Sequence, residues 1–592
     1  MYHLPFEPRL CPGDCMKRCG VPMNRCPVYP ALSSGLKAAC EGNLHLLQYL
    51  HMLPVKQIGV PEYYETLDRS LKGRKNPNLV YPVGARTFIH IMANQEDIRD
   101  HYIPVEPSLP MEIAGTIDLL DEIEERVADH VDDLEGIEDP EKRVQAILKI
   151  VEKVVTLRSG NGAKPVTGNK KGSKGSSAKG NGRKKGVIAV NRTQYQALRY
   201  LLRRKLQGLG VLEPMIADTN IEDISCSGLG AIFTEHRLFG GLRTAIEFDT
   251  HEELDRFVIG LAERIGHPVT FRDPVVDATL PDGSRINITY GTDVSKRGSN
   301  FTIRKFSPVP MSIIELLGQN TLDYEMAAYL SLVLQEHMNV FVSGETASGK
   351  TTLMNALCTF ISPDAKIVSI EDTPEVQVPH PNWIRGVTRG ASKGAGAESS
   401  GVDMFDLLKA ALRQRPNLII VGEIRGEEGA IAFQAMQTGH ACISTFHAAS
   451  VAKLVQRLTG DPIKVPKSYV DNLNVVVITQ MVHLPNGKTA RRITSVNEIV
   501  GYDSVSDSFS FIEVFSWDPV EDVFKFTGYM NSYLLEEKIA PRRGIPRNER
   551  RKIYEQVKRR AEVLRRMEGR GATNFYDVYS ILSKAYRDGH FR

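Results

Sequence analysis

The sequence predicts an α/β protein built on a parallel sheet, and three short apolar segments carry this prediction. They are residues 339–343, 366–370 and 418–422, and each is followed at once by glycines or acidic residues. Continuous apolar runs of this length are typical of strands that are buried on both faces. Because parallel strands present their chemistry where they end, we expect these three strand ends to lie together.

The first apolar segment leads into a loop that matches the pattern G-x-x-x-x-G-K-[ST] in full. The predicted nucleotide-binding residues are Gly344, Glu345, Thr346, Ala347, Ser348, Gly349, Lys350, Thr351 and Thr352. A strand before the loop and a helix over 352–360 supply the context that this motif requires. In such a loop, backbone N–H groups and the helix N-terminus surround phosphates. Lys350 would reach the β- and γ-phosphates, and the Thr351 hydroxyl would bind Mg²⁺. The alternative is a chance glycine-rich turn, which the full match disfavours.

The second and third segments end in acids, Glu371 with Asp372 and then Glu423. A carboxylate at a strand end beside a P-loop is the Walker B arrangement, in which the acid holds the water shell of Mg²⁺. Any one of these acids could instead be a solvated surface residue, but their shared position beside a P-loop favours chemistry. The residue pattern alone leaves open which acid has which role.

Four ordered motifs resemble those of the type II and type IV secretion ATPases. The P-loop resembles their Walker A motif, residues 370–375 (IEDTPE) their aspartate box and residues 421–425 (VGEIR) their Walker B motif. Thr438-Gly439-His440 and residues 444–448 (STFHA) resemble their histidine box. The amino-acid sequences of the P-loop and of residues 407–416 are most similar to those of the archaeal branch, which includes archaellum motors and archaeal pilus or secretion ATPases. The resemblance covers approximately residues 187 to 500.

The resemblance implies a RecA-like P-loop NTPase motor domain preceded by a smaller α+β domain. It implies that Glu371 is the base that polarises the attacking water and that Glu423, with Thr351, supports Mg²⁺. His440 and His447 match the histidines that lie near the γ-phosphate and the subunit interface in that family. A histidine outside such a motif is more often structural. The family also implies a homohexamer.

Two arginines upstream of the P-loop are candidates for transition-state stabilisation. Residues 281–285 and 301–305 are expected to form hairpin-like strands that carry Arg285 and Arg304. They resemble the arginines that the family's N-terminal domain brings over the nucleotide. A guanidinium at the γ-phosphate contributes roughly 10³ to 10⁵ in rate. Arg297 is equally basic and stays open as an alternative, and an arginine on an edge strand is ordinarily a solvated charge.

Cysteines cluster at the start of the chain. Residues 1–40 hold Cys11, Cys15, Cys19, Cys26 and Cys40, and disulfides are disfavoured in the cytosol. The first four are therefore candidate ligands of zinc or of an iron–sulfur cluster. Their spacing matches neither standard pattern, so a redox-labile or unliganded tail is the alternative.

The rest of the chain is expected to divide by composition. The expected segments are a cysteine-rich segment (1–40), an N-terminal extension (41–157) with an acidic amphipathic helix or helix pair within 111–139, a basic Gly/Ser/Lys flexible linker (158–186), an α+β domain (187–306), the RecA-like ATPase domain (307–520) with a small-residue loop at 390–401, and a C-terminal segment (521–592). The C-terminal segment contains a basic amphipathic helix whose apolar stripe comprises Ile553, Val557, Ala561 and Leu564. We expect that stripe to pack on the motor domain, and an anionic membrane surface is the alternative.

Net charge and hydropathy limit the classes of function that the sequence supports. The net charge is +3, which gives no global field to attract nucleic acid, and no apolar run approaches the roughly 18 residues of a membrane span. We expect a cytoplasmic protein that meets the inner face of the cell membrane through a partner. The leading function is a ring-forming ATPase, using ATP and Mg²⁺, that acts on a polytopic membrane platform to assemble or secrete pilin- or archaellin-like subunits. A nucleic-acid translocase or conjugation-type ATPase is the alternative, and a non-hydrolysing scaffold is disfavoured because every catalytic motif is present.

Overall fold

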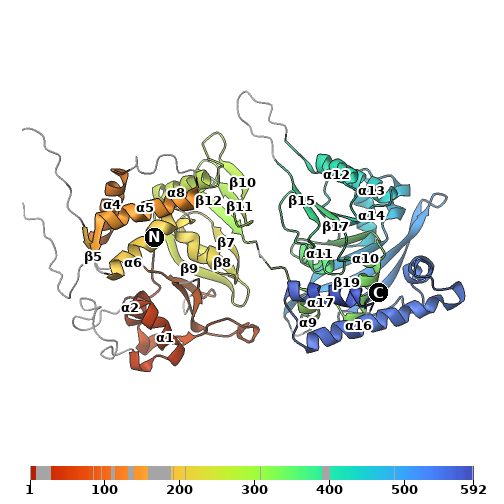
Figure 1. The fold of residues 1–592 in the computed structure, drawn as a ribbon, viewed down its shortest axis with the longest axis horizontal. Helices are drawn as coiled ribbons and strands as arrows, with labels where there is room; N and C mark the ends of the chain where they lie inside the picture. The colour runs from red at the N-terminus through yellow and green to blue at the C-terminus, as the bar shows by residue number, and fades with distance from the viewer. Residues whose placement is uncertain are drawn as a thin grey trace, which may run out of the picture. The chain divides into compact units, whose positions relative to one another are not determined.

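The computed structural model describes residues 2–8, 29–84, 86–94, 97–107, 114–130, 139–157, 188–190, 192–206, 208–306, 309–389, 401–485, 487–589 and 591. The chain forms two compact units, Met1–Phe306 and Ser307–Arg592, and each is described by itself (Figure 1). Three segments singled out in the sequence lie outside the described residues: Cys11 to Cys26, the linker 158–186 and the loop 390–400.

The first unit is built on one sheet of ten described strands in the order β1-β2-β3-β4-β9-β8-β7-β12-β11-β10. The strands are β1 (Glu62–Tyr63), β2 (Asn78–Val83), β3 (Thr87–Met92), β4 (His101–Val105), β7 (Ile221–Cys226), β8 (Gly230–His236), β9 (Gly240–Phe248), β10 (Val275–Thr279), β11 (Arg285–Thr289) and β12 (Asn300–Arg304). The helices are α1 (Ser34–Gly42), α2 (Leu44–Met52), α3 (Val55–Ile58), α4 (Ala114–Ala128), α5 (Pro140–Val154), α6 (Arg192–Leu206), α7 (Glu213–Ala217) and α8 (His251–Arg264). A separate pair, β5 (Val155–Leu157) and β6 (Ile188–Val190), is parallel.

The strands of the N-terminal extension prolong the sheet of the α+β domain. β4 pairs with β9 in parallel, and a buried polar centre lies close to this junction. The Asp218 carboxylate, only 1% exposed, accepts hydrogen bonds from the hydroxyls of Tyr81 (2.5 Å) and Tyr102 (3.1 Å). Because a buried carboxylate needs such partners, these contacts bind the two parts of the sheet together.

The second unit contains a sheet of nine described strands in the order β15-β14-β16-β17-β13-β18-β19-β20-β21. The strands are β13 (Val340–Gly344), β14 (Ile367–Glu371), β15 (Trp383–Val387), β16 (Leu418–Glu423), β17 (Ala441–Phe446), β18 (Val475–His483), β19 (Thr489–Asp503), β20 (Ser508–Asp518) and β21 (Val523–Lys525). The strands from β15 to β18 are parallel, and β18 to β21 continue as antiparallel neighbours.

Helices cover both faces of this sheet (Figure 1). One core joins the alternate residues Val340 and Val342 to α9 (Ile313–Gly318), α10 (Tyr324–Gln335), α11 (Lys350–Cys358), α16 (Ile553–Gly569) and α17 (Phe575–Arg587). The other core joins Phe341 to α12 (Met404–Arg413), α13 (Glu428–Gln437) and α14 (Val451–Thr459). The continuous apolar runs in the sequence thus reflect strands that are buried on both faces.

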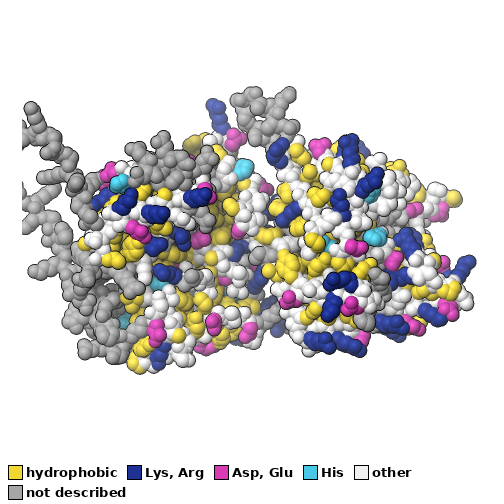
Figure 2. Space-filling view, in the orientation of Figure 1, with side chains coloured by type: hydrophobic (Ala, Val, Ile, Leu, Met, Phe, Trp, Pro, Cys, Tyr) yellow, Lys and Arg dark blue, Asp and Glu magenta, His cyan; other side chains and the backbone are white. Residues whose placement is uncertain are grey.

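The apolar stripe of the C-terminal segment packs inside the second unit, as expected. Ile553, Val557, Ala561 and Leu564 are buried in the same core as α10, and a π-helix (Leu534–Ile539) and α15 (Ala540–Arg542) precede α16. The outer face of α16 is rich in lysine and arginine (Figure 2).

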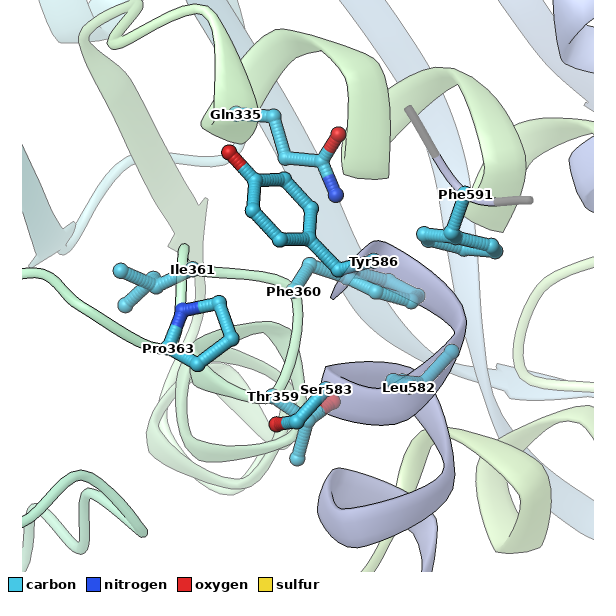
Figure 3. Close-up of a pocket in the computed structure, with 9 residues that line it drawn as sticks. All are labelled: Gln335, Thr359, Phe360, Ile361, Pro363, Leu582, Ser583, Tyr586 and Phe591. Atoms are coloured by element: carbon cyan, nitrogen blue, oxygen red, sulfur yellow. The ribbon is translucent and has the colours of Figure 1, made fainter. Parts of the chain in front are cut away.

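The end of the C-terminal segment packs beside the carboxyl end of the P-loop helix, α11. Phe591 stacks on Phe360, which follows α11, with ring centroids 6.2 Å apart. Side chains of α17, including Tyr586, line a small hollow beside this pair (Figure 3). The C-terminal segment is therefore part of the core that supports the P-loop.

Candidate active site

The predicted phosphate-binding loop connects β13 to α11. A Cβ atom on Gly344 would lie 2.2 Å from the carbonyl oxygen of Thr479 on β18, so this position tolerates no side chain. Ala347 (φ 62°) and Gly349 (φ 91°) have left-handed backbone conformations. The Ser348 hydroxyl donates to the Glu345 carbonyl over 2.8 Å and closes the loop. The sequence folds in this way because glycine occupies the crowded position and the second of the two left-handed ones.

The Lys350 ammonium lies inside this loop. Its Nζ donates to the carbonyl oxygens of Glu345 (2.8 Å) and Gly344 (3.2 Å). Burial lowers the pKa of Lys350, and the nearby Glu423 opposes that shift. The cation is thus held by backbone oxygens at the position where a P-loop receives phosphates.

Four parallel strands bring the predicted catalytic side chains to one edge of the sheet. β14 pairs with β16, β16 with β17, and β17 with β13, all in parallel. Glu371, Glu423 and His447 stand at or just beyond the carboxyl ends of β14, β16 and β17, and the P-loop follows β13. This is the edge at which open α/β sheets bind ligands.

Glu371 is the most enclosed acid of this edge, with a relative exposure of 1%. Its Oε1 accepts the backbone N–H groups of Glu375 (2.8 Å) and Val376 (2.6 Å), and its Oε2 lies 3.4 Å from Nε of Arg385. Burial raises the pKa of Glu371 to about 7, although these donors act in the opposite direction. A Cβ atom on Gly422 would lie 3.1 Å from Cγ of Glu371, so this glycine leaves room for the side chain.

His447 lies between Lys350 and Glu423. Its Nδ1 is 3.4 Å from Nζ of Lys350, and its Nε2 is 2.8 Å from Oε1 of Glu423. An ammonium can only donate, so we assign Nδ1 as the acceptor and Nε2 as the protonated nitrogen of a neutral ring. Burial lowers the pKa of His447, which agrees with the neutral form. The imidazole therefore connects the P-loop lysine with the strand-end acid.

The oxygens of Glu423 and Thr351 fit the requirements of Mg²⁺. Oε2 of Glu423 accepts from Arg425 over 2.5 Å, and the buried Oε1, which lies 2.8 Å from Nε2 of His447, has a second lone pair that no side chain of the described residues occupies. Oε1 thus keeps capacity for a metal-bound water, and Thr351 stands in the first turn of α11. Carboxylate and hydroxyl oxygens are preferred Mg²⁺ ligands. When bound with a nucleotide, this ion would neutralise charge on the β- and γ-phosphates.

His440 does not join the group within its own chain, so its expected place near the γ-phosphate and the subunit interface stays a prediction. It precedes Ala441, at the amino end of β17, whereas His447 follows the carboxyl end of the same strand. A strand of six residues separates them, or roughly 20 Å. Nδ1 of His440 lies 3.2 Å from the Thr438 hydroxyl.

The candidate arginines form a cross-strand pair in the first unit. Arg285 on β11 is directly opposite Arg304 on β12, and Nη2 of Arg285 lies 3.9 Å from Asp277. Like charges that face each other directly are destabilising, and here Asp277 and Asp223, which pairs in register with Arg304, partly offset the repulsion. Arg297 lies in the turn between the strands, and its carbonyl accepts the N–H of Leu229 over 3.1 Å.

Three further side chains contact the group without having been predicted. Arg385 on β15 faces Glu371, the Thr479 hydroxyl is 3.0 Å from the Ser348 hydroxyl, and Nε of Arg491 on β19 donates to Ala347 over 3.0 Å. No local motif marks these residues. They reach the site because β15, β18 and β19 are placed around β13 and β14 by strand order alone.

The described residues contain no group of three or more His, Cys, Asp or Glu side chains that could hold a metal ion. Cys40 is a buried core residue of α1. In the same described part of the chain, no helix is both long enough and apolar enough to cross a membrane.

Comparisons with known proteins identify the family. Residues 205–505 match the family described as "Type II/IV secretion system protein". An uncharacterised protein of Methanocaldococcus jannaschii is 43% identical over 559 residues, which cover 94% of this chain and 97% of that protein. A Sinorhizobium fredii chain named as a conjugal transfer protein is 29% identical, over 52% of this chain and 94% of its own length.

Among solved structures, the VirB11 ATPase of the Brucella suis type IV secretion system is 25% identical. The similarity covers 48% of this chain and 91% of that one, with a TM-score of 0.25. With the family match, the near full-length relative and the α/β unit that carries the P-loop, the chain belongs to the type II/IV secretion system family and is an ATP hydrolase of that family.

Proposed function

We propose that this protein is a ring-forming ATPase, a homohexamer, that converts ATP hydrolysis into work on a membrane-embedded assembly platform. The platform is a polytopic membrane protein, and the material moved is a pilin- or archaellin-like subunit. The ATPase would be cytoplasmic and would meet the inner face of the cell membrane through that partner. The observation that carries the proposal is the convergence of Lys350, Glu371, Glu423 and His447 on one sheet edge, in a chain of this family.

Each side chain has a proposed role in hydrolysis. Glu371 is the general base that polarises the attacking water, and Glu423 with Thr351 holds Mg²⁺. Lys350 binds the β- and γ-phosphates, and His447 senses the γ-phosphate through its contacts with Lys350 and Glu423. Arg285 and Arg304 would supply the guanidinium that meets the charge developing on the γ-phosphate. The cross-strand pairing of these two like charges supports this role.

Two substitutions separate nucleotide binding from turnover. Lys350→Ala should weaken ATP binding, because it removes the cation held inside the P-loop. Glu371→Gln should keep Mg·ATP binding but lower kcat by about 10² or more, since the amide cannot act as a base. Binding is measured with a fluorescent ATP analogue, and turnover by phosphate release. Normal hydrolysis by Glu371→Gln protein would remove the proposed role of this acid.

A nucleic-acid translocase is the second candidate, and the similarity to a chain named as a conjugal transfer protein favours it. The net charge of +3 gives little general attraction for a polyanion. The two functions can be distinguished by whether DNA stimulates ATP hydrolysis. Single- or double-stranded DNA should leave the ATPase rate within about twofold at physiological salt if the platform function holds, and a large salt-sensitive stimulation would favour the translocase.

A further inference from the structure

Arg385 contacts the candidate active site but belongs to none of the family motifs identified in the sequence. It lies on β15, one of the two edge strands described for the second sheet, and it is paired in register with Ser369 of β14. Its Nε is 3.4 Å from Oε2 of Glu371. Within the described residues, Arg385 is the only cation at ion-pair distance from the Glu371 carboxylate.

The surroundings of Glu371 explain why one cation matters so much. The carboxylate is 1% exposed, and two backbone N–H groups fix only one of its oxygens, Oε1. Removing a carboxylate from water strongly favours its neutral form unless charge and hydrogen bonds compensate. Arg385 supplies the charge, and it also sets the direction of the second oxygen. The Cys358 thiol of α11 also interacts with Glu371, and burial keeps this thiol neutral by raising its pKa to about 12.

Arg385 is itself supported by a short chain of contacts on the same face of the two strands. The Trp383 indole N–H donates to the Ser369 hydroxyl over 2.8 Å, which fixes the ring. The guanidinium of Arg385 lies over that ring, 5.3 Å from its centroid. A long side chain is costly to order, and an aromatic platform reduces this cost. Trp383 thus holds Arg385, and Arg385 faces Glu371.

We propose that Arg385 is a positioning residue for ATP hydrolysis, which orients the Glu371 carboxylate and keeps it ionised in its buried site. The inference rests on the proposed role of Glu371 as the base. Arg385 acts only through Glu371, and nucleotide binding depends on the P-loop instead. Because Arg385 stands on β15, this strand would contribute to catalysis through Glu371.

The test is a double-substitution cycle on the full chain. Arg385→Ala should lower kcat about tenfold and leave KM for ATP within about twofold, since a displaced base affects turnover and not binding. Arg385→Lys, which keeps the charge, should have a kcat at least about threefold higher than that of Arg385→Ala. In a Glu371→Gln background, Arg385→Ala should cause no further loss beyond about twofold, because there is no carboxylate left to position.

Arg413→Ala is the matched control, since Arg413 is an exposed arginine at the end of the neighbouring α12, and it should leave both constants unchanged. Thermal unfolding confirms that each variant is folded. The proposal is overturned if Arg385→Ala changes nothing, if it raises KM as much as it lowers kcat, or if its loss persists in the Gln background. Normal hydrolysis by the Glu371→Gln single variant would instead disprove the role of Glu371 itself, so the two failures are distinguishable.

Discussion

The Glu371 carboxylate combines burial with the need to carry a negative charge. Its environment contains two backbone N–H donors, one guanidinium and an adjacent glycine, Gly422, which leaves room for the side chain. Burial outweighs these donors and raises the pKa to about 7. A base whose pKa lies near the working pH transfers protons efficiently.

This shift predicts the pH dependence of turnover. Glu371 must be ionised to act as a base, so kcat should fall as the pH drops through about 7, and about a tenth of the sites should be active one unit below. Steady-state rates between pH 5.5 and 8.5, at saturating Mg·ATP, measure this acid limb of the pH–rate profile, in which kcat falls with pH.

The Glu371→Gln variant supplies the control for that limb, since its residual rate should lack it. His447 cannot account for a limb near 7, because burial lowers its pKa below the usual 6.5. An acid limb retained by the Gln variant would mean that another group titrates.

Arg304 should affect turnover and not binding. Arg304→Ala should leave nucleotide affinity within a few-fold, since binding belongs to the P-loop. It should lower kcat at least about a hundredfold, or roughly 2.7 kcal/mol of transition-state stabilisation. Arg297→Ala is the comparison, because Arg297 lies in the turn that precedes β12. Near-normal hydrolysis by Arg304→Ala would end the arginine hypothesis.

At the scale of elements, α16 has two dissimilar faces. Its apolar side is buried against α10, and Arg560 extends this contact by donating to the Ser331 hydroxyl of α10 over 2.9 Å. Its outer side carries exposed basic residues such as Arg559. The helix therefore stabilises the motor unit with one face, and only the other remains for charged partners.

The buried face makes a stability prediction. Leu564 is fully buried, so Leu564→Ala should lower the free energy of unfolding by about 2–5 kcal/mol, through lost apolar burial and a cavity. Arg559→Ala on the exposed face should stay within about 0.5 kcal/mol. Denaturant unfolding of the full chain checks both. Equal stability of the two variants would contradict the packing of this helix.

At the scale of the whole molecule, the N-terminal cysteines pose a separate question from the ATPase. Cys11, Cys15, Cys19 and Cys26 lie outside the described residues, so the zinc or iron–sulfur centre remains a prediction from their clustering in the sequence. Neighbouring parts of the segment are structural, because Leu36 and Cys40 of α1 are buried in a core with β2 and β3.

The metal is best tested by substitution rather than by deletion. Deleting residues 1–40 would remove Leu36 and Cys40 from that core, whereas replacing the four cysteines by serine would not. Anaerobically purified protein should carry close to one zinc, or an iron–sulfur chromophore, and the four-serine variant should lose it while keeping ATPase activity. Elemental analysis that finds neither metal would disprove the prediction, as would metal that survives the substitutions.

The features of this protein that depend on neighbouring residues could be predicted from its sequence. The P-loop, the strand-end acids and the amphipathic stripe of α16 are encoded by contiguous patterns, because loop, strand and helix geometry repeat over a few residues. The family and its ATPase activity followed from these motifs.

The contacts between distant side chains became visible in the folded chain and could not be predicted from the sequence. The fold separated His440 from His447 along β17, and it brought Arg385, Thr479 and Arg491 to the P-loop and Glu371. It also joined the N-terminal extension to the sheet of the α+β domain through β4 and β9. Strand order and register arise from burial and pairing between distant segments, and no local pattern encodes them.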